Sequence, residues 1–138
     1  MTSKEFCSKW LPMLEKVETN ESLKEKCRVY SAFVPSKQDN EVSSEIKFHM
    51  FLEEAYDSGI VVTNYGEIVQ NFNEEIVSEP TDDFIAGLSE QGIIGCIAWH
   101  FRRDHFSEGS LINESIANGS LLKYFKALIG KNNRCYID

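Results

Sequence analysis

Cys96, His100 and Asp104 follow one another at intervals of four residues, a spacing that lines up their side chains along one side of a helix. Thiolate, imidazole and carboxylate groups are all zinc ligands, and two ligands at i and i+4 on one helix are a known arrangement. The candidates for a fourth ligand are His49, His105 and Cys135. The spacing therefore predicts a candidate metal site at Cys96, His100 and Asp104.

The same three residues also have the types of a thiol nucleophile with a base and an orienting acid. Their neighbours Ile97 and Phe101 are apolar and predict that this stretch is buried. A buried cysteine is usually inert, and a buried histidine more often makes a hydrogen bond within the core. Both the chemical and the structural interpretation are open at this point.

Directly after this apolar run, the stretch FRRDHFSEG (residues 101–109) concentrates charged side chains. Arg102, Arg103 and His105 are candidate ligand-binding residues, because guanidinium groups bind oxyanions and the amides of a following helix would add donors. Such a site would suit a small enzyme or a sensor of an anionic ligand. The alternative, which we favour, is that the stretch joins two helices.

The residues of this joint each have a structural role. Arg102 and Arg103 would lie in the last turn of the incoming helix, where cations complement the free carbonyls. Ser107 is expected to cap the next helix, and Phe106 and Leu111 have the spacing of a hydrophobic staple. We also expect acidic residues of the preceding segment to pair with the two arginines.

Residues 93–128, IIGCIAWHFRRDHFSEGSLINESIANGSLLKYFKAL, resemble a bacterial family catalogued only as a domain of unknown function. Its motif is Arg-x-acid-Arg-Phe-x-x-Gly, followed ten residues on by a glycine and a leucine-rich helix. The matching positions are Arg102, Asp104, Phe106, Gly109, Gly119, Leu121 and Leu122. His105 replaces the usual arginine, so any chemistry of that arginine would be lost or altered here.

FLEEAYDSGIVVTNYGEI, residues 51–68, also resembles a helix–glycine–aromatic segment of that family. The resemblance implies that residues 41–129 form the core of one bacterial or phage domain. It implies no particular activity, because the family is catalogued without a function.

The net charge of −8 is concentrated in the middle of the chain. Residues 41–90 hold twelve Asp or Glu against one lysine, a charge of −11, whereas residues 1–40 and 91–138 come to +1 and +2. A phosphate backbone would repel such a chain, so nucleic-acid binding is not expected. The acidic segment is either a solvated face or a docking surface for a protein partner with a basic surface. The candidate partner-binding residues are Glu53, Glu54, Asp57, Asp82 and Asp83.

These features favour a non-catalytic, acidic protein-interaction module. An inhibitor from a phage or from a bacterial defence system would be one form of it. There is no Gly-rich phosphate loop and no G-x-S-x-G motif, and we expect no cofactor.

The composition also bears on location. No apolar run approaches the roughly 20 residues of a membrane helix, and the start MTSKEFCSKW has charges where a signal peptide needs an apolar core. The four cysteines include no C-x-x-C pair, which favours reduced thiols. We therefore expect a soluble cytoplasmic protein.

The elements that must position these residues are mainly helical. A length of 138 residues predicts one domain, residues 1–138. The apolar spacing predicts a mainly α fold of about five helices, with two or three short strands at one edge. The clearest helix covers residues 43–58 and ends at Gly59. The candidate strands are residues 28–35, 60–66 and 134–138.

Three other helices carry expectations of their own. Residues 3–18 have helical spacing with Thr2 and Glu5 as a capping box, and Pro12 predicts either a kink or a later start near Leu11. A helix capped by Thr81 or Asp82 is expected to break near Gly92. Two short helices are expected to end at Gly119 and Gly130.

Overall fold

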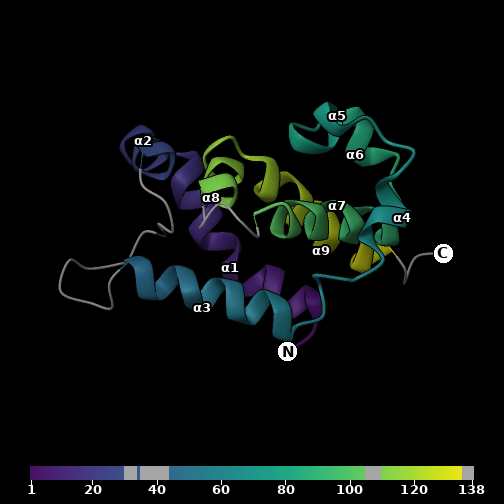
Figure 1. Cartoon of the computed structure of the whole chain (residues 1–138), viewed down its shortest axis with the longest axis horizontal. Coiled ribbons are helices and arrows are strands. Elements are labelled where there is room, and N and C mark those ends of the chain that lie inside the picture. The colour runs from purple at the N-terminus through teal and green to yellow at the C-terminus, as the bar shows by residue number, and fades with distance from the viewer. Residues whose placement is uncertain (30–33, 35–43, 105–109, 135–138) are drawn as a thin grey trace.

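Helices make up all of the regular secondary structure in the described part of the chain (Figure 1). The computed structural model describes residues 1–29, 34, 44–104 and 110–134, and these ranges contain nine helices. Their bounds are α1 Ser3–Glu18, α2 Glu21–Val29, α3 Ser44–Asp57, α4 Tyr65–Val69, α5 Glu74–Ser78, α6 Asp82–Ala86, α7 Glu90–Arg102, α8 Ser110–Ala117 and α9 Ser120–Arg134. The predicted mainly α class is confirmed, but the chain is cut into more and shorter helices than the five predicted.

The predicted edge strands are wrong wherever the structure describes them. Residues 60–64 form an irregular turn, residues 65 and 66 already belong to α4, and the described ranges contain no strand. Ile60 and Val61 are buried, so these β-branched side chains fill the core instead of pairing with a neighbouring strand. Residues 28 and 29 belong to α2 and residue 134 to α9, while 30–33, 35 and 135–138 lie outside the described residues.

The first helix begins at the predicted capping box and is not interrupted at its proline. Thr2 Oγ1 accepts a hydrogen bond from Glu5 N at 3.1 Å, and Glu5 Oε1 accepts one from Thr2 N at 2.8 Å. Pro12 lies inside α1 rather than at its start. Both Pro12 and Ser8, whose carbonyl loses its amide partner, are exposed, so water can replace the missing bond.

The boundaries of the later helices agree with the predictions at two glycines and differ from them at two others. Gly59 and Gly119 have positive φ angles of 81° and 82°, as predicted for residues that follow a helix. The predicted break near Gly92 occurs earlier, because Ser89 Oγ accepts from Gly92 N at 3.0 Å and caps a new helix, α7. Gly130 does not end α9, which continues to Arg134.

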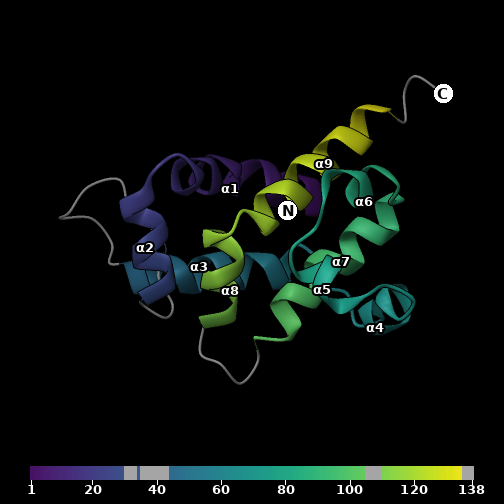
Figure 2. The ribbon, with the colours of Figure 1, turned by 90° about the horizontal axis from the view of Figure 1, so that it is seen from above.

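Aromatic side chains from α1, α3, α7 and α9 meet in the centre of the core. The Phe6 ring stacks on Phe51 with centroids 5.5 Å apart, and it meets the Phe101 and Phe125 rings edge-on at 6.4 and 5.7 Å. Trp10 meets Phe51 edge-on at 5.0 Å. Figures 1 and 2 show α1 and α9 crossing near this point, with α3 along the lower edge in Figure 1.

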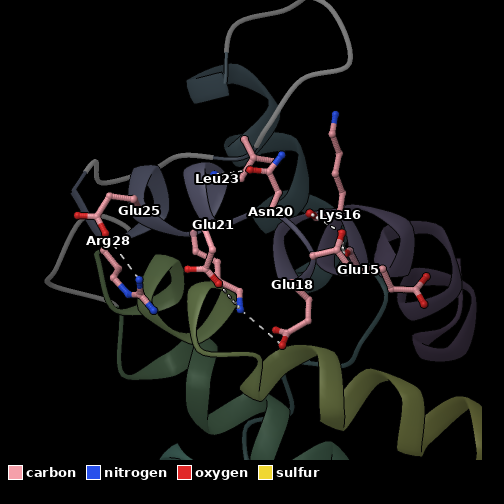
Figure 3. A network of polar contacts seen from close by, with 10 residues as sticks. Glu15, Lys16, Glu18, Asn20, Glu21, Leu23, Glu25 and Arg28 are labelled. Carbon is pink, nitrogen blue, oxygen red and sulfur yellow. Dashed lines mark hydrogen bonds and ion pairs between the residues drawn. The ribbon is translucent and has the colours of Figure 1, made fainter.

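The corner between α1 and α2 is held by polar contacts near the chain's surface (Figure 3). Asn20 Oδ1 caps α2 by accepting from Leu23 N at 3.1 Å. Lys24 Nζ lies 3.7 Å from Glu18 and 3.5 Å from Glu21. Glu18 also lies against Gly119, where any larger side chain would press on its carboxylate.

The helices α4, α5 and α6 lie together at the end of the molecule away from α2 (Figures 1 and 2). At Gly95 on α7 the missing side chain makes room for Ile68 of α4, which a Cβ atom would overlap. Among the helices that the structure describes, none is both long enough and apolar enough to span a membrane.

Candidate functional site

Asp104, two residues after the end of α7, links α7 to α8. Asp104 is buried, and its Oδ1 accepts hydrogen bonds from Leu111 N at 2.9 Å and Ile112 N at 3.1 Å. These are free amides of the first turn of α8, so a carboxylate from the end of α7 acts as a cap from seven residues upstream. The predicted cap Ser107 and the predicted staple residue Phe106 lie outside the described residues.

Arg103 links this joint to α8 without an ion pair. Its Nη2 donates a hydrogen bond to Ser115 Oγ at 3.2 Å, and its guanidinium carbon lies 4.6 Å from the centroid of the Trp99 ring. Burial lowers the pKa of Arg103, although the charges of Glu114 and Asp104 oppose the change. Arginine remains charged at neutral pH despite such a shift.

Arg102 points to a different helix. Its guanidinium carbon lies 5.6 Å from the centroid of the Tyr56 ring on α3. Neighbouring residues of a helix do not face each other, and here Arg102 contacts α3 while Arg103 contacts α8. The two guanidinium groups therefore do not converge on one ligand, and His105 lies outside the described residues.

The predicted acidic partners of the two arginines are not found. Among the described residues, no carboxylate forms an ion pair with Arg102 or Arg103. Each guanidinium group lies over an aromatic ring instead. A flat, weakly hydrated guanidinium group stacks on a ring with little loss of solvation. The Nε atoms of both arginines are buried and have no hydrogen-bond partner among the described residues.

His100 lies at the centre of a buried polar network formed by Val77, His100, Arg103, Ser115 and Tyr124. The carbonyl oxygen of Val77 lies 3.0 Å from Nε2 of His100 and accepts a hydrogen bond from Tyr124 Oη at 2.8 Å. A carbonyl can only accept, so we assign the imidazole proton to Nε2. Nδ1 then accepts from the Ser115 hydroxyl, whose Oγ lies 2.8 Å away.

Burial keeps this histidine neutral. Desolvation lowers the pKa of His100 from 6.5 to about 3, reinforced by the charge of Arg103 and opposed by the hydrogen bond to Val77. A hydroxyl bonded to a neutral imidazole is the pair found in enzymes that use a serine nucleophile. Here both His100 and Ser115 are 0 % exposed. No substrate reaches the hydroxyl, so the pair stabilises the fold.

The candidate metal site does not come together. Both ring nitrogens of His100 are engaged in hydrogen bonds, and Asp104 Oδ1 accepts from two amides. Cys96 is fully buried, and burial raises its pKa to about 11, which disfavours the thiolate that binds metal or attacks a substrate. Within the described ranges, no three His, Cys, Asp or Glu side chains are arranged to hold a metal ion. Cys135 and His105 lie outside those ranges.

Most of the acidic residues between 47 and 90 point into solvent. Seven exposed carboxylates have no ion-pair partner in the described part of the chain: Glu53, Asp57, Glu67, Glu74, Glu75, Glu79 and Asp83. Two of them lie on α3, and the others lie on or beside α4–α6. Figure 1 places α3 along the lower edge and α5 and α6 at the upper right, so these acids form two separate surfaces.

Two of the five predicted partner-binding residues have partners within the chain. Glu54 accepts hydrogen bonds from Lys9 Nζ at 2.8 Å and Trp10 Nε1 at 2.9 Å, which join α3 to α1. Burial by itself raises the pKa of Glu54. The two hydrogen bonds and the charge of Lys9 outweigh this effect and hold the pKa below its usual value of 4.5. Asp82 is almost fully exposed and lies 3.8 Å from Lys123 Nζ.

A crevice of about 230 Å³ lies between the α5–α6 connection and the first turn of α9. Its walls are joined by a bond of 2.6 Å from Ser120 Oγ to the Ser78 carbonyl and one of 3.1 Å from Lys123 Nζ to the Pro80 carbonyl. The cation that lines the crevice is thus already bonded. The lining residues are Glu79, Pro80, Asn118, Ser120 and Lys123.

Comparisons with protein-family models, with curated proteins and with solved structures find no match to this chain. The resemblance of residues 93–128 to a domain of unknown function stays a prediction.

Proposed function

We propose that the chain is a non-catalytic interaction module that binds a basic surface of another protein through the carboxylates of residues 41–90. The observation that carries this proposal is the set of seven exposed carboxylates without an ion-pair partner among the described residues. Like charges left unpaired within each of these two acidic surfaces repel each other, and a basic partner relieves that repulsion. Complementary charge also speeds association and selects the partner.

The described residues around the end of α7 support the same proposal, because their polar side chains are engaged within the fold. His100 and Ser115 are fully buried, and Asp104 and Arg103 are held by contacts within the fold. We infer that the protein is cytoplasmic. An inhibitor that covers a basic site of its target would be one form of such an interaction module. The net charge of −8 disfavours nucleic acid as the partner.

A second candidate is a binding protein or enzyme for a small anionic ligand, using Arg102, Arg103 and His105. One observation favours it: Arg102 has no carboxylate partner in the described ranges. The divergence of the two guanidinium groups argues against it, since Arg103 is already bonded to Ser115.

Affinity capture from the source organism tests the interaction proposal. The bait is the wild-type chain beside a variant with Glu53→Gln, Asp57→Asn and Asp83→Asn. The matched control neutralises Glu15, Glu21 and Glu25, which have ion-pair partners on the surface of α1, α2 and α9. A captured protein is then purified and its Kd measured by calorimetry at rising salt.

We expect a basic partner whose affinity falls with salt and falls further in the first variant than in the control. A partner that binds wild type and both variants equally well, at all salt concentrations, would contradict the proposal.

A further inference from the structure

We propose that the partner docks on one face of α3 as an amphipathic basic helix. This inference rests on the proposed function and names the surface that performs it. The face consists of His49, Met50, Glu53, Tyr56 and Asp57, all of which are exposed. Their positions, at i, i+1, i+4, i+7 and i+8, place them on one side of the helix. We call this surface the outer face of α3.

The outer face of α3 exposes apolar side chains of the kinds found at the centres of interfaces. Met50 is 42 % and Tyr56 46 % exposed, and among the described residues only Met1 and Val29 are other exposed large apolar side chains. The Arg102 guanidinium group already lies over the Tyr56 ring, so Tyr56 forms the edge of the outer face and Met50 its apolar centre. Methionine and tyrosine are enriched in interface cores, and tyrosine is common among the residues that dominate binding energy. Burying two such side chains favours a partner with an apolar stripe.

The acidic side chains of the outer face of α3 indicate a positively charged partner. Glu53 and Asp57 are exposed and have no ion-pair partner in the described part of the chain. Glu53 lies between Met50 and Tyr56 along the helix, so the apolar and acidic groups interleave. A partner helix that alternates apolar residues with lysine or arginine at helical spacing would match both.

The opposite side of α3 makes the outer face rigid. Phe51 and Ala55 are fully buried, and Glu54 is held by Lys9 and Trp10 of α1. Figure 1 shows the other helices above α3 and α1 also beside its right-hand end. A face that is already ordered costs little conformational entropy when it binds, which favours docking on this helix over a mobile segment.

The end formed by α4–α6 is more acidic but less suited to this partner. It holds unpaired carboxylates such as Glu74, Glu75 and Asp83, but the described residues there include no exposed large apolar side chain. Its helices have five residues each, whereas α3 has fourteen. We therefore assign the α4–α6 end to long-range attraction and the outer face of α3 to contact.

The test uses a fluorescent peptide of leucine and lysine, about 18 residues or five helical turns long, with all leucines on one face. A second peptide has the same composition in scrambled order, so that it keeps the charge and loses the apolar face. Fluorescence anisotropy gives the Kd of each for the whole chain. Two variants probe the outer face of α3, Met50→Ser and Glu53→Gln.

Each variant has a matched control elsewhere. Val29→Ser removes an apolar side chain that is 63 % exposed on α2, and Glu75→Gln removes an unpaired exposed carboxylate on α5. We expect the amphipathic peptide to bind more tightly than the scrambled one. Met50→Ser and Glu53→Gln should each weaken binding about fivefold or more, and the controls by less than about twofold. Circular dichroism confirms that every variant is folded.

Two results would overturn the inference in different ways. If Glu75→Gln weakens binding as much as Glu53→Gln, while Met50→Ser changes nothing, the acidic surface binds cations without using the outer face of α3. The inference then fails and the proposed function stands. If neither peptide binds at low salt, the proposed function itself fails.

Discussion

His100 Nδ1 lies 2.8 Å from Ser115 Oγ, and this fully buried bond joins α7 to α8. Through Nε2 and the Val77 carbonyl the same imidazole reaches α5, and the Tyr124 hydroxyl brings α9 to the same carbonyl oxygen. The network around this neutral side chain thus joins four helices, α5, α7, α8 and α9. We expect the stability of the C-terminal half to depend on it.

Removing the serine hydroxyl should destabilise the protein. Ser115→Ala leaves the buried His100 Nδ1 without a donor and the half-buried Arg103 Nη2 without its acceptor. The free energy of unfolding should fall by about 1–3 kcal/mol, the usual cost of unsatisfied buried polar groups. Urea denaturation measures it, with Ser8→Ala on the exposed side of α1 as the control. An equal effect of the two substitutions would show that the network contributes nothing.

The same histidine should make stability depend on pH. In the unfolded chain His100 takes up a proton near pH 6.5, but in the folded chain burial lowers its pKa to about 3. The contribution of neutral His100 to the free energy of unfolding is therefore fully present above pH 6.5. It falls as the pH drops toward 3, by up to about 1.4 kcal/mol per pH unit. The lowered pKa values of Glu5 and Glu54 act in the same direction only below about pH 4.5.

Urea denaturation at pH 7 and pH 5 separates these contributions. His100→Gln should remove most of the difference between the two pH values, and His49→Gln, on the exposed side of α3, should keep it. A wild-type stability that is the same at pH 7 and pH 5 would mean that His100 is not buried in the neutral form.

Neighbouring glutamates on α3 should respond differently to truncation. Glu54→Ala removes the acceptor of Lys9 Nζ and Trp10 Nε1 and should lower the free energy of unfolding by about 1–2 kcal/mol. Glu53→Ala changes an exposed residue without an ion pair and should stay within about 0.5 kcal/mol of wild type. Chemical denaturation of both variants checks this, and a larger loss in Glu53→Ala would contradict the structure.

Two glycines in helices should give opposite effects when replaced by alanine. At Gly95 the new methyl group would overlap Ile68, so Gly95→Ala should destabilise the protein by about 1–3 kcal/mol. Gly66 lies on α4 with no atom near its Cβ position, and Gly66→Ala should stabilise it by about 0.5–1 kcal/mol. Thermal unfolding measures both. Adding Ile68→Ala to Gly95→Ala should recover part of the loss.

Sequence patterns predicted the helices whose limits are set by local chemistry. The capping box at Thr2 and Glu5 and the glycine after α3 are local signals, and both occur as predicted. The strand predicted at residues 60–66 failed because Ile60 and Val61 are buried in a helical core, which a local pattern does not distinguish from burial in a sheet. The number of helices was also underestimated, since caps such as Ser89 divide what hydrophobic spacing presents as one helix.

The polar contacts of the joint were harder to predict. The sequence marked Arg102 and Arg103 as structural, but it assigned acidic partners to the arginines, offered Asp104 as a metal ligand and missed Ser115. A serine in a helix and a backbone carbonyl at Val77 carry no pattern, because their role arises only when α5, α7 and α8 meet. The same limit applies to Glu54, which looks like its neighbour Glu53 until α1 packs beside it.

The interaction and ligand hypotheses predict opposite outcomes of one thermal-shift experiment. The melting temperature is recorded with the amphipathic leucine–lysine peptide and, separately, with phosphate and citrate, for wild type and for Arg102→Ala. If the carboxylates of residues 41–90 are the functional surface, the peptide raises the melting temperature of both proteins at low salt and the anions do not. A rise of several degrees with an anion in wild type that disappears in Arg102→Ala would contradict this and make the arginine the functional residue.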